Sequence, residues 1–308
     1  MIASTITIPV YSQPHFLHTT LHALVRNSAY KHRIIIVWSD SDRIGPPFGQ
    51  KPGGFTDFET TDKFIASRRF ASVRHFLDDH AGWLRDHGIE TLDVTDRALA
   101  FRESFARGHV WHGAAGTPEG GVDTAFKNNL GLEVTDTEWT IPNWDCDFYP
   151  APGWDRSVFD YAQREKPKRE LLIPMHVQPK FMTAGEAAKW NVWRDSPAVA
   201  CHRLTIATTY SVGGQACVTD DDVKEFVRFE KRGGEIIREP AGKRERLHWV
   251  PWILRSDDLR SVGGFNYQGG GYDLEFDDRM GRLGFTKVGF CDAFVFHKAF
   301  PPVVGCYS

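Results

Sequence analysis

Two aspartates, Asp145 and Asp147, flank a single cysteine shortly after the strand-like run 137–141. Successive side chains of an extended segment point to opposite sides, so two residues at this spacing face the same way. Paired carboxylates of this kind can hold one hard divalent cation or its coordinated waters. The following segment, 148–154, is rich in proline and glycine and is expected to turn. Acidic residues are also common in solvated turns, so the pair needs support from the rest of the chain.

The elements expected to position this pair begin with a β-α-β pattern. Segments 5–10 and 34–38 are rich in β-branched and apolar residues, and apolar residues recur at helical spacing between 16 and 25. Two strands joined through a helix favour a parallel sheet with right-handed crossovers. In the rest of this half we expect helices over 61–87 and 97–111 and a strand over 89–94. The stretches 44–54 and 113–121 are expected to be a Gly/Pro-rich loop and a flexible connector. The segment 123–132 then leads into the strand 137–141.

The second half changes character at Pro150 and is expected to be a mixed α/β region with a less regular layout. Its expected pieces are strand-like segments over 171–173, 204–207 and 249–254, with an Asp-rich helix start at 220–222. Ligands of open parallel sheets gather at the carboxyl ends of the strands. The acidic residues that follow two of the strands, Asp40 and Asp145, are therefore expected to face one cleft.

The composition is that of an ordinary globular protein. With 308 residues, 41% of them apolar, the chain can bury one large core or two modest ones. No stretch approaches the roughly 18 apolar residues that span a bilayer, and no basic region precedes an apolar one at the N-terminus, so we expect a soluble, cytoplasmic protein. The five cysteines form no C-x-x-C pair and are expected to be reduced thiols. A formal charge of −3 gives no overall attraction to nucleic acid, although 166–169 and 243–246 are locally basic.

The C-terminal part of the chain carries another acidic pattern. Val262-Gly263-Gly264-Phe265 is followed by three glycines at 269–271 and then by Tyr272-Asp273-Leu274-Glu275. Arg279 comes four residues after Glu275, and a strand-like run ends at His297. A glycine-rich loop directly before an acidic helix start is a pattern suited to a loop that closes over a ligand.

In this order, these motifs resemble those of glycosyltransferase family 2 and related GT-A glycosyltransferases. In that family a V-G-G-F element precedes an acidic helix start, and a later strand ends in histidine. The N-terminal half agrees with the resemblance. Pro9-Val10-Tyr11 resembles the signature of the first strand, and Asp40 resembles the acidic end of the second strand. Asn129-Leu130-Gly131 resembles the asparagine-x-glycine element that precedes the D-x-D motif, which is Asp145-Cys146-Asp147 here. The resemblance touches most of the chain, excepting about 43–120 and 156–247.

The resemblance implies a GT-A fold, in which a Rossmann-like, mostly parallel sheet flanked by helices binds a nucleotide sugar. Residues 1–155 would form this half and residues 156–308 a mixed α/β acceptor-binding half, within one continuous domain. The implied activity is that of a metal-dependent, inverting, hexosyltransferase-type glycosyltransferase. It would move a sugar from a nucleotide sugar, with a UDP-sugar as the expected donor, to an acceptor hydroxyl by direct displacement.

The resemblance also assigns the catalytic base to Asp273, while Tyr272 stands where the family usually has a glutamate. An inverting transfer needs one carboxylate to take the proton of the acceptor hydroxyl as its oxygen attacks the anomeric carbon. Closure of the loop 269–271 would exclude water from the donor. The alternative is that Asp273 and Glu275 only favour the N-terminus of a helix, where negative charge is stabilising.

The implied metal is Mn²⁺, with Mg²⁺ as the alternative, because a histidine and carboxylates beside diphosphate oxygens suit Mn²⁺. Asp147 and His297 are the implied direct ligands, and Asp145 would contact the metal, a coordinated water or the ribose. Further residues are predicted to contact the rest of the nucleotide. Pro9, Val10 and Tyr11 would line the pocket of the base, and Asp40 would accept a hydrogen bond from the base. Lys127 would lie near the diphosphate, and Asn129 belongs to the motif that precedes the D-x-D.

The acceptor is expected to meet a separate set of residues: Trp249, Trp252, Gly270, Gly271, Tyr272 and Glu275. The two tryptophans could stack on a ring of the acceptor or could equally belong to a core strand. A saccharide or another hydroxyl compound is the expected acceptor, and a modified base in DNA is a lesser alternative suggested by the basic clusters. A retaining enzyme on the same fold and a catalytically silent carbohydrate-binding or scaffold protein also remain open.

Overall fold

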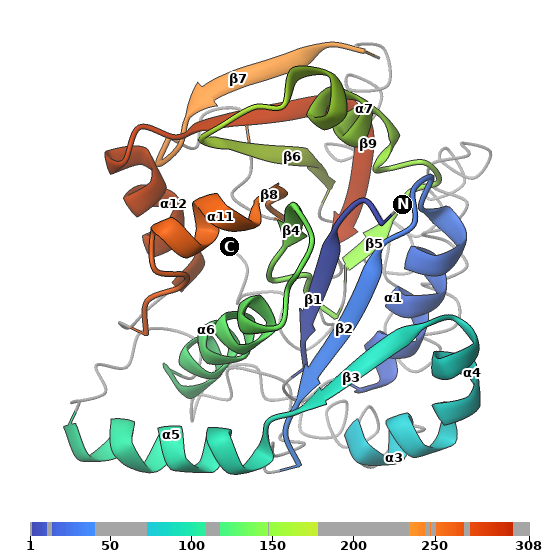
Figure 1. Cartoon of the computed structure of the whole chain (residues 1–308), viewed down its shortest axis with the longest axis vertical. Coiled ribbons are helices and arrows are strands. Elements are labelled where there is room, and N and C mark those ends of the chain that lie inside the picture. The colour runs from blue at the N-terminus through green and yellow to red at the C-terminus, as the bar shows by residue number, and fades with distance from the viewer. Residues whose placement is uncertain are drawn as a thin grey trace, which may run out of the picture.

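The computed structural model describes residues 2–10, 14–40, 73–108, 118–146, 148–177, 234–243, 247, 251–267 and 272–297. These ranges contain two sheets with helices around them (Figure 1). The helices are α1 (Pro14–Asn27), α3 (Val73–Asp79), α4 (Ala81–Asp86), α5 (Thr95–Gly108), α6 (Pro118–Glu133), α7 (Arg156–Glu165), α11 (Ser256–Ser261) and α12 (Tyr272–Arg282). None of the helices in the described ranges is long and apolar enough to cross a membrane.

The first sheet has the strand order β3-β2-β1-β4-β8. Its strands are β1 (Thr5–Pro9), β2 (Arg33–Trp38), β3 (Ile89–Asp93), β4 (Trp139–Ile141) and β8 (Leu254–Arg255). β1 pairs in parallel with β2 and β4, β2 pairs in parallel with β3, and β8 pairs antiparallel to β4. The predicted mostly parallel sheet is therefore confirmed, and it ends on an antiparallel edge strand.

The alternation of side chains along β2 explains why helices cover both faces of this sheet. Ile34 and Ile36 pack into a cluster with apolar residues of α1, α3 and α4, whereas Ile35 and Val37 pack with residues of α5 and α6. A strand buried on both faces reads as a continuous apolar run, which is the pattern of 34–38. The run therefore predicted both the strand and its double cover.

The second sheet is built around β9 (Thr286–His297). β9 pairs in parallel with β6 (Glu170–Val177) and antiparallel with β5 (Phe148–Pro150) and β7 (Ile236–Pro240). β5 comes before the predicted boundary at residue 155 but belongs to this second sheet, and β8 comes after it but belongs to the first. One apolar cluster contains residues of both halves, so the two halves share a core.

Several expected elements differ from those observed. The stretch 113–121 was expected to be a flexible connector, but α6 already begins at Pro118. The long helix expected over 61–87 is described from Val73 onward, where it is divided into α3 and α4. β7, α7 and α11 were not predicted. The expected pieces over 44–54, 204–207 and 220–222 lie outside the described residues.

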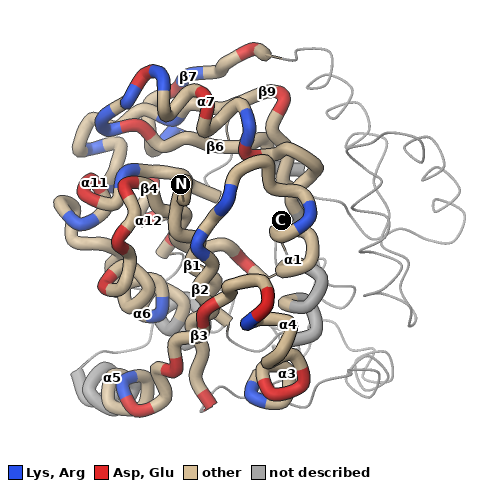
Figure 2. Tube along the Cα trace, turned by 45° about the vertical axis from the view of Figure 1, so that its right-hand side comes forward, with Lys and Arg blue, Asp and Glu red and all other residues tan. Residues whose placement is uncertain are grey.

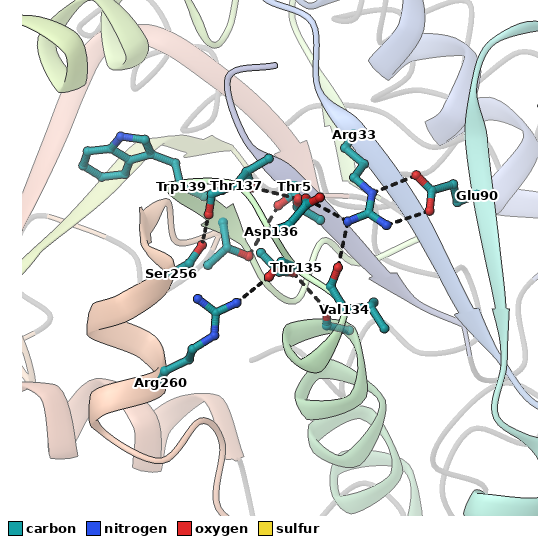
Figure 3. A network of polar contacts seen from close by, with 12 residues as sticks. Thr5, Arg33, Glu90, Val134, Thr135, Asp136, Thr137, Trp139, Ser256 and Arg260 are labelled. Carbon is teal, nitrogen blue, oxygen red and sulfur yellow. Dashed lines mark hydrogen bonds and ion pairs between the residues drawn. The ribbon is translucent and has the colours of Figure 1, made fainter. Parts of the chain in front are cut away.

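A polar network fixes the loop between α6 and β4 at the amino end of the first sheet (Figure 3). Arg33 donates to both carboxylate oxygens of Glu90 at 2.7 and 2.8 Å and to the carbonyl of Val134 at 2.7 Å. From α11, Arg260 donates to the carbonyl of Thr135, and the hydroxyl of Ser256 donates to the carbonyl of Thr137 at 2.7 Å. Two arginines on different elements thus set where β4 begins.

The contact between α6 and β1 gives the first testable prediction. A Cβ added at Gly131 would lie 2.3 Å from the Cγ2 of Thr7, a buried strand residue. We expect Gly131→Ala to lower the free energy of unfolding by about 1–3 kcal/mol, because helix and strand would have to separate. Urea unfolding measures this change. Gly82→Ala is the control, since nothing lies closer than 3.9 Å there, and it should stabilise the protein by about 0.5–1 kcal/mol. Equal effects of the two substitutions would contradict the close approach.

The pair of Arg33 and Glu90 gives a prediction with a defined pH dependence. The hydrogen bonds from Arg33 lower the pKa of Glu90, so the pair stabilises the fold above the unfolded-state pKa and loses this effect as the pH falls through the folded-state pKa. We expect Glu90→Gln to cost about 1 kcal/mol near pH 7, since the glutamate is half exposed, and almost nothing once the pH is below the lowered folded-state pKa of Glu90.

Urea unfolding between these pH values measures the difference. Glu133→Gln serves as the comparison, because its pair with Arg97 is exposed by more than half on both sides. A loss for Glu90→Gln that does not depend on pH would contradict the role of the ionised pair.

Candidate functional site

The carboxyl ends of the four parallel strands lie at one edge of the first sheet, and four of the described candidate residues lie there. Pro9 ends β1 and Val10 follows it; Asp40 comes after β2, and Asp145 comes shortly after β4. The structure thus brings these predicted residues to a common edge. Tyr11 and Asp147 lie outside the described residues.

One turn of α6 connects this edge to the rest of the site. The Nζ atom of Lys127 is fully buried and donates to the carbonyl of Val10 at 2.6 Å. Lys127 therefore holds the backbone that follows β1. Its predicted contact with the diphosphate stays a prediction. The next residue, Asn128, exchanges two hydrogen bonds with Asn143, at 3.0 and 3.1 Å.

Asn129 has a scaffold role that the sequence did not reveal. Its Oδ1 accepts from the backbone nitrogen of Phe265, and its Nδ2 donates to the carbonyl of Phe265, both at 2.8 Å. Nδ2 also donates to the hydroxyl of Tyr267 at 2.9 Å. A Cβ at Gly264 would lie 2.4 Å from the Asn129 Oδ1, which explains why the V-G-G-F element and the asparagine occur together. Asn129 therefore has a scaffold role, and its predicted contact with the nucleotide stays a prediction.

The D-x-D segment begins in an unusual backbone conformation. Asn143 has φ of 58°, in the left-handed region that asparagine tolerates better than most residues. It is almost fully buried, and its Oδ1 also accepts a hydrogen bond from the hydroxyl of Tyr272 on α12. The backbone nitrogen of Trp144 then donates to the carbonyl of Thr7 at 3.0 Å, and that of Phe148 to the carbonyl of Asp145 at 3.0 Å. The segment around Asp145 is thus fixed before it turns.

Helix α1 holds the same segment from another side. The buried hydroxyl of Thr20 lies 2.5 Å from the carbonyl oxygen of Cys146 and 3.1 Å from that of Phe148. These two carbonyls flank residue 147 in the chain. Phe148 in turn pairs with His297 in the register of β5 and β9. The backbone pairing therefore places the last residue of β9 beside Phe148, which follows Asp147 in the chain.

The acidic helix start is observed as predicted, since α12 begins at Tyr272 with Asp273 and Glu275 in its first turn. Asp273 is half-buried and accepts at Oδ1 from the backbone nitrogen of Leu274, 2.9 Å away. Glu275 is held at Oε1 by Arg279 and Asn266, both at 3.1 Å. Its Oε2 is buried and has no hydrogen-bond partner among the described residues.

The far side of α12 is anchored by buried charges. The ammonium of Lys287 lies 3.0 Å from Glu239 and 3.5 Å from Asp277, and all three residues are buried. A Cβ at Gly281 would lie 2.2 Å from the carbonyl oxygen of Ala241, so α12 lies directly against the turn that follows β7. Burying charges costs desolvation, and this arrangement therefore serves to fix the position of α12 more than to stabilise the fold.

Asp40 and its surroundings form a second polar cluster at the same edge. Arg74 lies 3.0 Å from Asp40 and 3.9 Å from Asp93, with its guanidinium over the Trp38 ring at 5.0 Å from the centroid. Pairing with Asp40 raises the pKa of Arg74, so the arginine stays charged. In the sequence Arg74 is one of the basic residues of a predicted helix, and its pairing with Asp40 was not foreseen because it lies in the stretch that resembles no family motif. Elsewhere on the described trace Lys and Arg alternate with Asp and Glu (Figure 2).

One predicted acceptor residue needs correction. Trp252 is fully buried, and its ring packs 5.9 Å from that of Phe265 and 4.7 Å from that of Phe276. A ring with no exposed face cannot stack on an acceptor, so Trp252 belongs to the core, the alternative that the sequence left open. Trp249, Gly270 and Gly271 lie outside the described residues, whereas Tyr272 and Glu275 lie at the start of α12.

Within the described ranges, no group of three or more His, Cys, Asp or Glu side chains could hold a metal ion. Of the predicted ligands, only the side chain of Asp145 is described. The predicted metal site therefore stays a prediction, and the pairing of β5 with β9 is the described feature that bears on it.

Comparisons with known proteins concern the fold. No protein-family model and no curated protein matches this chain in sequence. Among solved structures, residues 1–349 of TarS from S. aureus match with a TM-score of 0.50 and 9% identity, covering 96% of this chain and 60% of that one.

Two further structures match more weakly. The longer S. aureus TarS structure and GalNAc-T7 with UDP, GalNAc and Mn²⁺ have TM-scores of 0.49 and 0.48, with 9% and 11% identity. Each covers 96% of this chain, but only 37% and 43% of the matched chains is covered. This chain thus spans less than two thirds of the length of all three. TarS is a GT-A glycosyltransferase, and the likeness confirms that this chain has the predicted GT-A fold.

The support of the D-x-D segment by α1 is testable through stability. Thr20→Val removes a buried hydroxyl while keeping the shape of the side chain, so two carbonyls lose their donor. We expect the free energy of unfolding to fall by about 1–2 kcal/mol in urea titrations. Thr140→Val is the matched control, because that buried hydroxyl makes only a long 3.4 Å hydrogen bond. A Thr20→Val protein as stable as the control would show that the hydroxyl does not hold the segment.

Proposed function

We propose that this chain is a metal-dependent, inverting glycosyltransferase that transfers a hexose-type sugar from a nucleotide sugar, a UDP-sugar in particular, to an acceptor hydroxyl. The GT-A fold is compatible with this chemistry but does not specify it, because one fold hosts many activities. The proposal therefore rests on the site. The observation that carries it is that the D-x-D segment meets both other elements with predicted catalytic residues: α12 through Tyr272 and Asn143, and the end of β9 through Phe148 and His297.

The donor would lie along the carboxyl edge of the first sheet. Val10 would face the nucleotide at the end of β1, and the Asp40 carboxylate would accept a hydrogen from the base. The guanidinium of Arg74 lies 3.0 Å from Asp40 and fixes the position of that carboxylate. These residues bind and orient the donor, and the alignment of donor and acceptor lowers the barrier by removing the entropy of encounter.

The metal would be held by Asp147 and His297, with Asp145 on the metal, a coordinated water or the ribose. Two carboxylates and an imidazole are a donor set that suits Mn²⁺ and accommodates Mg²⁺. When bound, the ion would offset the negative charge of the departing nucleoside diphosphate. Thr20 and Asn143 keep the backbone of this segment in place, so the carboxylates need not reorganise when the donor binds.

Asp273 would act as the base. Its position in the first turn of α12 is favourable for a carboxylate, because the helix N-terminus carries partial positive charge. The carboxylate would take the proton of the acceptor hydroxyl while the hydroxyl oxygen forms the bond to the anomeric carbon and the bond to the diphosphate breaks. One displacement of this kind inverts the configuration at the anomeric carbon. NMR of the product tests that outcome, and a retained configuration would favour the retaining alternative.

Metal dependence is tested by the release of UDP from a panel of UDP-sugars with Mn²⁺, Mg²⁺ or EDTA. We expect turnover of one donor with the metal and a loss of at least about 100-fold in EDTA and in Asp147→Ala, because the charge of the leaving group is then not offset. Absence of both turnover and donor binding in every condition would contradict the proposal and favour the silent scaffold.

The base is tested by Asp273→Asn. We expect kcat to fall by about 10²–10⁴-fold while the donor still binds, since the amide cannot take the proton. Asp257→Asn is the control, because this carboxylate lies in the first turn of α11 and its side chain is 86% exposed. Full activity of Asp273→Asn would remove Asp273 from the role of base.

A further inference from the structure

The hydroxyl of Tyr272 makes a contact that the family pattern does not provide. It donates to the Oδ1 atom of Asn143, across the gap between α12 and the segment that leads to Asp145. The family usually has a glutamate at the position of Tyr272. An ionised carboxylate has no hydrogen to donate, so it could not make this bond to an amide oxygen. Tyr272 and Asn143 therefore form a pair that belongs to this chain.

Asn143 is a fixed partner for this contact. Its side chain is 1% exposed, its backbone lies in the left-handed region, and its backbone nitrogen donates to Asn128 at 3.0 Å. Its Oδ1 accepts from Asn128 as well as from Tyr272, so both lone pairs of that oxygen are used. Asn143 cannot move without breaking its hydrogen bonds with Asn128 on α6. A residue that binds Asn143, such as Tyr272, is therefore held at a fixed place relative to α6.

Tyr272 is fixed from its other side. Its ring packs edge-on to that of Phe265 at 5.8 Å between centroids, and the backbone of Phe265 is bound by Asn129. The start of α12 is thus tied to neighbouring residues of α6 by two routes, one through Asn143 and one through Phe265. Only the first route also passes through the D-x-D segment.

From these contacts we propose that Tyr272 and Asn143 are positioning residues that set Asp273 at a fixed place relative to Asp145. The inference rests on the proposed function, because it concerns the base and the donor-binding segment of that reaction. Asp273 directly follows Tyr272, and Asp145 comes two residues after Asn143, so the hydrogen bond spans the short path between the two carboxylate-bearing segments. Without it, the first turn of α12 can shift relative to the donor.

Tyr272→Phe tests the proposal, since it keeps the ring and removes only the hydroxyl. We expect kcat for sugar transfer to fall about 10–100-fold, because small displacements of a catalytic group are costly, while the KM for the donor changes less than about threefold. A purely structural role would lower the melting temperature without this separation of kcat from KM. Tyr30→Phe is the matched control, because its hydroxyl binds Asp160 away from the site.

A double-mutant cycle identifies the partner. Asn143→Gly permits the same backbone conformation and removes the side chain, and Tyr272→Phe should then cause no further loss of kcat in that background. Asn143→Asp, which can still accept from the tyrosine, should retain more activity than Asn143→Gly.

The outcomes separate this inference from the proposed function. A wild-type protein that turns over no nucleotide sugar overturns the proposed function, and the catalytic role of the pair with it. An active wild type with unchanged kcat in Tyr272→Phe, or with independent losses in the double mutant, overturns only the pairing of Tyr272 and Asn143.

Discussion

The site depends on one turn of α6, in which consecutive side chains hold different parts of the molecule. Lys127 binds the end of β1, Asn128 binds the start of the D-x-D segment, and Asn129 binds the turn before α12. Gly131 allows this turn to lie directly against β1, where any side chain would collide with Thr7. The constraint is both steric and polar. Helix α6 must lie close to β1 for the side chains of Lys127, Asn128 and Asn129 to form their hydrogen bonds, and these bonds in turn hold α6 in place.

This arrangement explains how a site can be built from segments that are far apart in sequence. The strand ends bring residues that we propose bind the nucleotide to one edge, but α12 belongs to a later part of the chain and must be placed against that edge. It is held on one side by the α6 contacts and on the other by the buried charges around Lys287. Fixed dipoles and charges that need not reorganise are what an enzyme uses to stabilise a developing charge. Buried polar contacts are costly to form, which is consistent with a purpose beyond stability.

Much of the fold could be predicted because its determinants are local. The apolar run 34–38 gave β2, and the acidic pair following a strand gave the position of the D-x-D segment at a strand end. The order of the motifs gave the GT-A fold. β7 could not be foreseen, because its residue types do not follow its alternating burial: Ile236 is exposed and the charged Glu239 is buried. Its pairing with β9 is also a long-range contact that no local pattern encodes.

The site was predicted less completely, for physical reasons. Asn129 and Lys127 were placed on the nucleotide from the motif that contains them, and the sequence did not reveal that their polar atoms also bind the protein itself. The sequence around an aromatic residue near a motif does not indicate whether its ring is exposed or buried. Trp252, which is fully buried, could therefore not be assigned to the core from sequence. The pairing of Arg74 with Asp40 and the role of Asn143 were not foreseen, because neither a long-range ion pair nor a left-handed asparagine carries a spacing signal.

The most direct test is a crystal structure of the protein with UDP and Mn²⁺. The account predicts the diphosphate and the ion beside Asp145 and the start of α12, the base near Asp40, and an unchanged hydrogen bond between Tyr272 and Asn143. A nucleotide bound away from the carboxyl edge of the first sheet, or an ion that contacts neither the D-x-D segment nor the end of β9, would contradict it.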